Sequence, residues 1–456
     1  MIQTRSPVWY VAEISPFGYL SLQRFQFKIV GDPSVEAWNR VRRYASWMRC
    51  VKVDDSSVLT EDTYHKLRLN SPAGGWFPAL QTLSWDVMKS NLPHIDLFLS
   101  PHLKRISISP PSSQTIPHEI LPAIASAIST LPASALETLL MEIDQDMVPP
   151  SYLKDSLSSV VLRCGPSLTR FTSLVPLSDA AVNHLIQLPH LRTWHTGGPP
   201  PTYAPSSLPP VFPPITKFTL ESCAANGWLS LFKHLEHTAS TIHGATPMSR
   251  VKQSLKSLNI IEGSPDPIID VSFTSTIQIF RDLVSLNVWT DCHDNNGGGQ
   301  CIFRLDNDDV IKLVTTLSQL ESLLLGDPCF ENTCTTTVAC LLPISVYSTK
   351  LRDLTIHFNT TNFVEDFKGI SRDPRFQELR SLPRCTLSCL YVSQTPLTLD
   401  GPGFETVANG MTDLFPALQN IVGDERAWWQ LDERIGKLQR IRTPPSQLEV
   451  LASDTS

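Results

Sequence analysis

The sequence has no surplus of positive charge. It carries 37 Lys and Arg residues against 44 Asp and Glu residues, which gives a formal net charge of −7 at pH 7. Proteins that bind nucleic acid neutralise phosphates with Lys and Arg, so a chain of this charge has no overall electrostatic footprint for DNA or RNA. We therefore expect no nucleic-acid partner.

Long apolar runs are also absent. No stretch of about 18 uninterrupted apolar residues occurs, and the most apolar segment, residues 120–140, is broken by Ser, Thr, Pro and Glu. The first twenty residues lack the basic start and apolar core of a secretory signal. These absences predict no membrane partner and a cytoplasmic or nuclear location.

Motifs for chemistry are missing as well. Ten cysteines in 456 residues are too few for a disulfide scaffold. Residues 292–301, CHDNNGGGQC, lack the second ligand pair of a zinc finger and the Lys-Ser/Thr of a phosphate-binding loop. Asp306, Asp308 and Asp309 lie where a helix is expected to start, not in a calcium-binding loop. The sequence contains neither G-x-S-x-G nor H-E-x-x-H, so it predicts no catalytic residues, no metal and no cofactor.

What the sequence does contain is one short motif that recurs many times, which we call the phrase. The phrase is L-x-x-L-x-L with other large apolar residues allowed, as in Leu255-x-x-Leu258-x-Ile260. Its starts span 396 residues, with gaps from 23 to 40 residues between neighbours. The fourteen starts are Leu22, Met48, Leu80, Leu103, Leu136, Leu168, Leu191, Ile215, Leu255, Leu283, Leu320, Leu351, Leu387 and Leu418.

The phrase predicts a strand, and the residues between phrases predict helices. Its last two apolar positions are two residues apart, which is the period of a strand with one buried face. Between phrases, residues 178–188 offer Ser178 as a helix N-cap, followed by Val182, Leu185 and Ile186 on one helical face. One strand and one helix per period of this length is typical of a leucine-rich repeat. We therefore predict an α/β leucine-rich-repeat solenoid, with a curved parallel sheet on the concave face and helices and loops on the convex face.

An ordinary doubly wound α/β domain is the alternative, because it also alternates strands with helices. That fold does not explain why the same leucine spacing opens each strand. The chain also has no Gly-rich turn after its first predicted strand.

Three regions are predicted along the chain. Residues 1–21 form an N-terminal remnant or cap, residues 22–425 an irregular repeat array, and residues 426–456 a capping helix and tail. The cap is expected because the end of a repeat array exposes its core, although Trp428 and Trp429 are also compatible with a partner surface. Residues 199–214, half of them proline, favour an extended convex segment over a docking site for a proline-binding domain.

Several segments carry a resemblance to a known family. Residues 35–53, 77–85 and 177–194 resemble the F-box/leucine-rich-repeat proteins of mushroom-forming (basidiomycete) fungi. The resemblance implies the substrate-binding part of a receptor in an SCF-type cullin–RING ubiquitin ligase. It implies a target protein on the repeats and a Skp-type adaptor on the F-box.

The F-box itself has no counterpart in the sequence. Members of that family open near an LPxE motif and close near a Leu-Trp pair. Residues 6–15, SPVWYVAEIS, resemble the segment directly after an F-box, with Pro7, Val8 and Trp9 in place of its closing residues. We expect the F-box to be lost or to precede residue 1, and an adaptor contact only in the second case.

The predicted binding residues alternate with the buried positions of the strands. Polar side chains interrupted by aromatic ones suit a protein-recognition face, although each single position also suits a solvated strand. The predicted concave-face residues are Arg105, His195, Lys217, Glu221, Asn259, Asn287, Trp289, Asp353, His357 and Tyr391. The sequence thus predicts a non-enzymatic protein-recognition module that resembles an F-box receptor, or alternatively an interaction scaffold unconnected to ubiquitin.

Overall fold

A computed structural model provides the structure of the chain. The described residues are 33–53, 59–87, 92–109, 118–143, 150–197, 214–221, 254–262, 268–269, 271–290, 302–303, 305–326, 335–378, 384–393, 397, 399, 401–423 and 425–442. The predicted segment 1–21, the phrase at Leu22 and the loop 292–301 lie outside the described residues, as do all but the last of residues 199–214. The chain separates into two compact units, residues 1–215 and 216–456, which we call unit 1 and unit 2. The predicted boundaries at residues 22 and 426 stay predictions.

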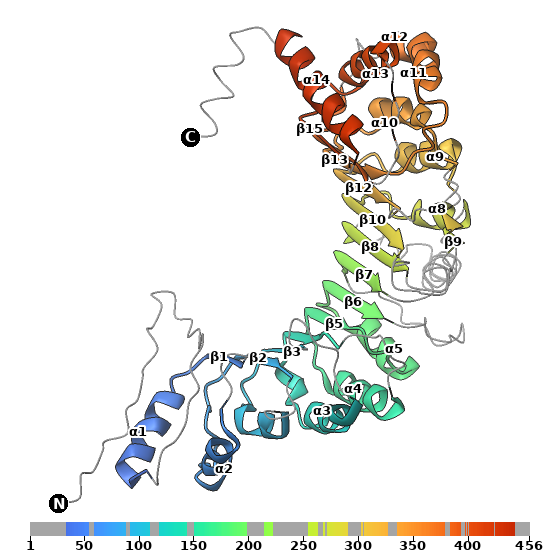
Figure 1. Cartoon of the computed structure of the whole chain (residues 1–456). Coiled ribbons are helices and arrows are strands. Elements are labelled where there is room, and N and C mark those ends of the chain that lie inside the picture. The colour runs from blue at the N-terminus through green and yellow to red at the C-terminus, as the bar shows by residue number, and fades with distance from the viewer. Residues whose placement is uncertain are drawn as a thin grey trace, which may run out of the picture. The chain divides into compact units, whose positions relative to one another are not determined.

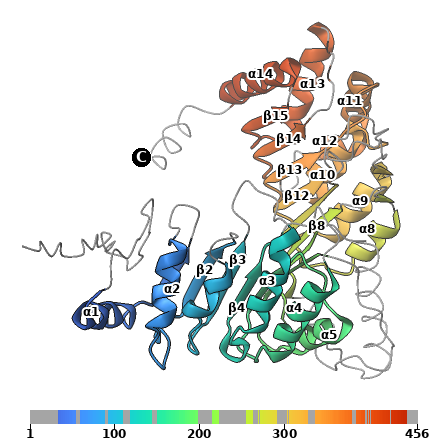
Figure 2. The ribbon, with the colours of Figure 1, turned by 60° about the horizontal axis from the view of Figure 1, so that its bottom comes forward.

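Unit 1 alternates strands and helices along its described residues. Its strands pair in chain order and all in parallel, and its helices lie along one side of the sheet (Figures 1 and 2). The strands are β1 (Cys50–Val53), β2 (Thr82–Asp86), β3 (Arg105–Ser109), β4 (Thr138–Met141), β5 (Arg170–Ser173) and β6 (Thr193–Gly197). The α-helices are α1 (Val35–Ala45), α2 (Glu61–Leu69), α3 (Leu121–Ser129), α4 (Ser151–Arg163) and α5 (Asp179–Gln187). Short 3-10 helices cover Leu92–Phe98, His118–Ile120 and Ala133–Ala135.

Unit 2 repeats the arrangement. Its main sheet is again parallel and in chain order, with a separate two-stranded sheet of β9 (Ile268–Ile269) and β11 (Ile302–Phe303) (Figure 1). The main strands are β7 (Lys217–Glu221), β8 (Ser257–Glu262), β10 (Ser285–Thr290), β12 (Ser322–Leu325), β13 (Asp353–Ile356), β14 (Cys389–Ser393) and β15 (Asn420–Gly423). The helices are α8 (Val271–Ile277), α9 (Asn307–Thr316), α10 (Leu341–Tyr347), α11 (Phe363–Arg372), α12 (Pro374–Glu378), α13 (Gly401–Leu414) and α14 (Arg426–Arg442), with a 3-10 helix at Val338–Cys340.

The repeated phrase sets the register of both sheets. Leu286, the second apolar position of its phrase, pairs with Leu258 on one side and Leu323 on the other. In each unit the equivalent residues form an unbroken row across the strands, and the second position is buried in every described phrase. The predicted α/β leucine-rich-repeat fold is confirmed, because each repeat places the same side chains into one continuous core.

Within each unit, one backbone arrangement joins neighbouring repeats. The carbonyl of Lys256 accepts hydrogen bonds from the amides of Val284 and Ser285, at 2.8 and 2.9 Å. The carbonyl of Val284 in turn accepts from Glu321 and Ser322 of the following repeat, at 2.8 and 3.1 Å. This forked contact fixes where each strand starts. A one-residue slip in register would break it and would turn the leucines outward.

Helix starts follow the predicted caps. The Ser178 side chain accepts a hydrogen bond from the amide of Ala181 at the start of α5. At the start of α9, Asp306 accepts from the amide of Asp309 at 2.9 Å, and the Asp309 carboxylate accepts from the amide of Asp306. Asp306 and Asp309 therefore form a helix capping box at the helix start that the sequence predicts.

Two strands of unit 1 place a polar residue where the phrase normally has its third apolar residue. Ser173 in β5 is fully buried, and its hydroxyl donates to the carbonyl of Val175 at 3.0 Å. Thr196 in β6 is 2% exposed, and its hydroxyl donates to the carbonyl of Gly197. These hydrogen bonds to nearby backbone offset the desolvation that a buried hydroxyl would otherwise suffer.

Helix α14 covers the last strand of unit 2. The final phrase ends in Gly423 instead of a large apolar residue, and a Cβ there would lie 2.8 Å from the Trp428 ring. Trp428 is 1% exposed and its ring meets Phe363 edge-on at 5.7 Å. The indole thus fills the space that a side chain at the third position of the phrase would occupy.

Side chains of α14 also satisfy the backbone of this edge strand. Asp432 accepts a hydrogen bond from the amide of Ile421 at 2.6 Å, and the Gln439 side-chain amide donates to the carbonyl of Leu418 at 2.6 Å. Unpaired strand edges invite pairing with another chain, so these contacts cover both the core and part of the edge hydrogen-bonding groups. Among the described helices, none is long and apolar enough to span a membrane.

Replacing Leu286 with alanine tests the core assignment. Leu286 is fully buried, so we expect Leu286→Ala to lower the free energy of unfolding by about 2–5 kcal/mol. The neighbouring Ser285→Ala, on the opposite face of the same strand, should stay within about 0.5 kcal/mol of the parent. Urea unfolding followed by circular dichroism measures both, and equal effects would show that the inside and outside of the strand are misassigned.

Replacing Asp432 with alanine tests the cap. Asp432→Ala removes the acceptor of the Ile421 amide, and we expect a loss of about 1–3 kcal/mol in stability. Hydrogen exchange at the Ile421 amide should become faster. Glu433→Ala is the matched control, because Glu433 pairs only with Lys437 on the exposed side of α14, and it should leave this exchange rate unchanged.

Candidate functional site

The candidate site is the side of each sheet that faces away from the helices, which we call the strand face. Strand residues that alternate with the buried positions project there. The structure places nine of the ten predicted binding residues at such positions, and His357 lies directly after the end of β13. In unit 1 they are Arg105 and His195; in unit 2 they are Lys217, Glu221, Asn259, Asn287, Trp289, Asp353, His357 and Tyr391.

Pairing between strands brings several of the unit 2 residues together. Asn259 in β8 lies opposite Asn287 in β10, and Thr355 in β13 lies opposite Tyr391 in β14. Arg105 and His195 of unit 1 lie on strands three apart in the sheet and are not neighbours. Lys217 and Glu221 begin and end β7, so the strand separates them as well.

The prediction missed three apolar residues on the unit 2 strand face. Ile261 pairs with Trp289, Leu324 pairs with Asn287 and Thr355, and Val422 pairs with Tyr391. The predicted set contains only polar and aromatic side chains, so it leaves out these three aliphatic residues. The available signal was their place in the phrase: Leu324 is the fifth residue of LESLLL, a position that alternates with the core.

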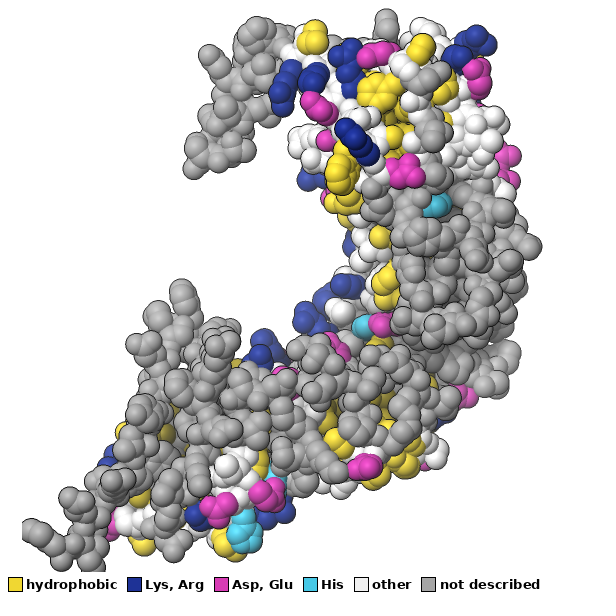
Figure 3. Space-filling model, viewed as in Figure 1, with side chains coloured by type: hydrophobic (Ala, Val, Ile, Leu, Met, Phe, Trp, Pro, Cys, Tyr) yellow, Lys and Arg dark blue, Asp and Glu magenta, His cyan; other side chains and the backbone are white. Residues whose placement is uncertain are grey.

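Trp289, Leu324, Tyr391 and Val422 form what we call the apolar row of unit 2. Tyr391 and Val422 are 40% and 45% exposed, and hydrophobic side chains appear in yellow along the strand side of unit 2 in Figure 3. Gly326 follows the Val288–Leu325 pair and therefore lies beside Trp289. It has a positive φ of 85°, which favours glycine, and it places no side chain of its own against the indole.

Two titratable groups on this face stay neutral near pH 7. Burial lowers the pKa of His357 below its usual value, which favours the uncharged imidazole. A hydrogen bond with the Cys389 side chain raises the pKa of Tyr391, and the negative charge of Asp353 acts in the same direction. Neither His357 nor Tyr391 thus adds a charge of its own to this face at that pH.

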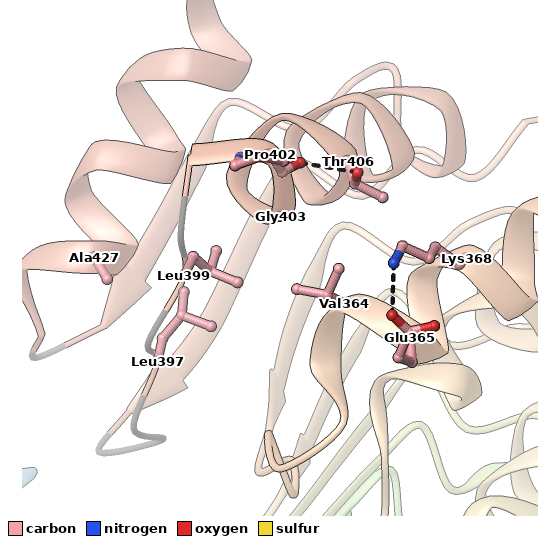
Figure 4. A pocket seen from close by; sticks show the side chains of 9 residues that line it. All are labelled: Val364, Glu365, Lys368, Leu397, Leu399, Pro402, Gly403, Thr406 and Ala427. Atoms are coloured by element: carbon pink, nitrogen blue, oxygen red, sulfur yellow. Dashed lines mark hydrogen bonds and ion pairs between the residues drawn. The ribbon is translucent and has the colours of Figure 1, made fainter.

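A pocket of about 840 Å³ lies elsewhere in unit 2, among α11, α13 and the start of α14 (Figure 4). Leu397, Leu399 and Val364 line it with aliphatic side chains, and the ion pair of Lys368 with Glu365 lies at one side. Its described lining residues include no histidine and no cysteine, and nothing in the sequence had indicated it. In the described part of the chain, no group of three or more His, Cys, Asp or Glu side chains could hold a metal ion.

Comparison with known proteins adds a likeness in fold. No protein-family model and no curated protein matches the sequence. Among solved structures, the chain is similar to the leucine-rich-repeat-containing protein LegL7 from Legionella pneumophila, at 11% identity over 85% of this chain and 97% of that one, with a TM-score of 0.26. It is also similar to a leucine-rich-repeat protein from Leptospira interrogans, at 12% identity over 87% of this chain and 100% of that one, with a TM-score of 0.31. Neither comparison links the chain to F-box proteins or to fungi.

The lowered pKa of His357 has a measurable consequence. The imidazole should titrate below its usual value of about 6.5 in an NMR pH titration. Because the unfolded chain takes up this proton at a higher pH than the folded chain, acidification through that range should reduce the free energy of unfolding. His357→Gln should lack this part of the pH dependence, and a native midpoint at or above 6.5 would contradict the assignment.

Proposed function

We propose that this chain is a non-enzymatic protein-recognition module and that unit 2 binds a target protein on its strand face. The observation that carries the proposal is the apolar row, because large apolar side chains project from adjacent or next-but-one strands among Asn, Thr and Ser residues. Protein interfaces combine such aromatic and aliphatic anchors with a polar rim. Leucine-rich repeats suit this role because their strands hold the side chains on a rigid frame.

The predicted polar residues complete this surface. Asn259 and Asn287 lie side by side on the strand face, and Asp353 and Lys217 start strands at its edge. We propose that these groups supply orienting hydrogen bonds around the apolar row. His357 contributes as a neutral donor or acceptor, because its pKa is lowered.

A narrower role is the substrate receptor of an SCF-type ubiquitin ligase, acting in the cytoplasm or nucleus with a Skp-type adaptor. It rests on the sequence resemblance alone, and an interaction scaffold unconnected to ubiquitin is the alternative. Affinity purification from native cells separates them. Recovery of a Skp-type adaptor and a cullin with the chain supports the receptor, and recovery of other partners without them supports the scaffold.

Substitutions in the apolar row test the binding face. We expect Trp289→Ala and Tyr391→Ala each to weaken binding of the recovered partner by about tenfold or more, because anchor residues supply much of the affinity of an interface. His357→Ala should weaken it less, and all three variants should keep the thermal stability of the parent to within a few degrees.

Tyr347→Ala is the matched control for Tyr391→Ala. Tyr347 lies on helix α10 in the same unit and is 41% exposed, against 40% for Tyr391. Partner affinity measured by biolayer interferometry should not change in the control. If Trp289→Ala and Tyr391→Ala bind the partner as tightly as Tyr347→Ala does, the strand face of unit 2 is not the binding surface.

A further inference from the structure

Basic residues gather at one edge of the strand face of unit 1. The starts of its strands, with the residue before each, carry five Lys or Arg residues and one acidic residue, Glu137. The corresponding positions of unit 2 carry three Lys or Arg residues and two acidic ones. Lys and Arg side chains appear in dark blue along the strand side of unit 1 in Figure 3. We call the five residues the cationic stripe; they are Arg49, Lys104, Arg105, Arg170 and Arg192.

We propose that the cationic stripe binds an extended acidic segment of a partner protein. The inference deepens the proposed recognition function and rests on it, since it assigns the chemistry of what the strand face of unit 1 receives. The net charge of the whole chain is −7, so the positive charge of the stripe is opposite in sign to the charge of the chain as a whole. Such a face attracts negatively charged partners selectively and repels basic ones.

Two arginines at the middle of the stripe are available to a ligand. Arg105 and Arg170 are exposed, and neither forms an ion pair with a described residue. Lys104, by contrast, already pairs with Glu137 at 2.8 Å. A guanidinium presents a planar fork of N–H donors that matches a carboxylate, so each of the two arginines can take one acidic side chain.

A hollow of about 360 Å³ lies between these arginines. Pairing of the strands places Thr138 between Arg105 and Arg170, and Thr82 on the other side of Arg105. The lining also contains Ser84, Ser107 and Thr169, so short hydroxyl side chains form much of its wall. Leu140 lines it too, as does Glu137, whose carboxylate is paired with Lys104. Because the serine and threonine side chains are short, they leave the hollow open, and their hydroxyl groups can donate hydrogen bonds to carboxylate or backbone oxygens.

The spacing suits an extended chain that crosses the strands. Neighbouring strands lie about 4.8 Å apart, so the backbones at Arg105 and Arg170 are roughly 10 Å apart. Alternate side chains of an extended peptide are about 7 Å apart, a distance that long arginine side chains can adjust to. The stripe from β1 to β6 covers roughly 24 Å, which is about seven extended residues.

A nucleic acid is the other polyanion to consider, and the face lacks what it needs. Single-stranded nucleic acid is held by stacking of its bases on aromatic side chains as well as by charge. At the described strand-face positions of β1 to β6 there is no Phe, Tyr or Trp. The charge and the hydroxyl-lined hollow therefore favour an acidic protein segment.

The test is direct binding of defined probes to the full chain, measured by fluorescence anisotropy at about 50 mM salt. The probe is a labelled peptide of about ten residues that alternates Glu with Ser. A Lys-Ser peptide and a single-stranded DNA of similar length serve as comparisons. We expect the parent chain to bind the acidic peptide more tightly than the DNA, to lose that binding at high salt, and not to bind the basic peptide.

Charge reversal then locates the site. Arg105→Glu with Arg170→Glu should weaken binding of the acidic peptide by about tenfold or more. The matched control, Arg40→Glu with Lys154→Glu, makes the same change in net charge on helices α1 and α4 and should stay within about twofold of the parent. Circular dichroism spectra and melting curves check that both double variants fold.

Three outcomes would overturn the proposal. They are no binding of the acidic peptide to the parent chain, an equal loss in the control variant, and DNA binding as tight as that of the peptide. The Tyr391→Ala variant should bind the acidic peptide normally. If the peptide fails to bind while partner binding still depends on Tyr391, only the present inference is wrong; if neither holds, the recognition function is wrong too.

Discussion

The structure depends on one constraint, which is that no single repeat can bury its own apolar face. Each strand and helix presents a row of leucines that only the neighbouring repeat can cover, so the repeats are stable when their rows are in register. The forked hydrogen bond from one repeat to the next, as at Lys256 and Val284, enforces that register through the backbone. Side chains at the alternating strand positions take no part in it. Those positions can therefore carry any chemistry that binding requires without loss of the core.

The same constraint means that the last strand needs something other than a repeat to cover its core side, and α14 covers it. The final phrase ends in Gly423, and Trp428 from the helix occupies the space that a core side chain would need. Asp432 and Gln439 form hydrogen bonds with backbone groups of the last repeat. Among the described residues, no further strand pairs with these groups. Core burial and backbone pairing at β15 are thus both completed by helix α14.

How much could be foreseen from the sequence depends on the range of the interactions. The phrase, the parallel strands and the helix caps at Ser178 and Asp306 follow from local spacing and short-range hydrogen bonds, and each was predictable. The apolar row was only half found, because the predicted binding residues are polar or aromatic and leave out the aliphatic Leu324 and Val422. The hollow beside Arg105 and the pocket beside Leu397 depend on how distant segments meet. The separation into two units likewise reflects packing that no local pattern encodes.

The two strand faces differ in chemistry although one phrase builds both. In unit 1 the strand starts carry the cationic stripe, whereas in unit 2 the strand centres carry the apolar row. Stability accounts for neither: exposed arginines such as Arg105 and Arg170, which form no ion pair with a described residue, add little to folding, and an exposed tyrosine or valine gains little from its partial burial. Folding stability therefore does not explain why Arg105, Arg170, Tyr391 and Val422 occupy these positions. Their side chains are held on rigid strands and directed away from the core, which is the arrangement that recognition of a partner requires.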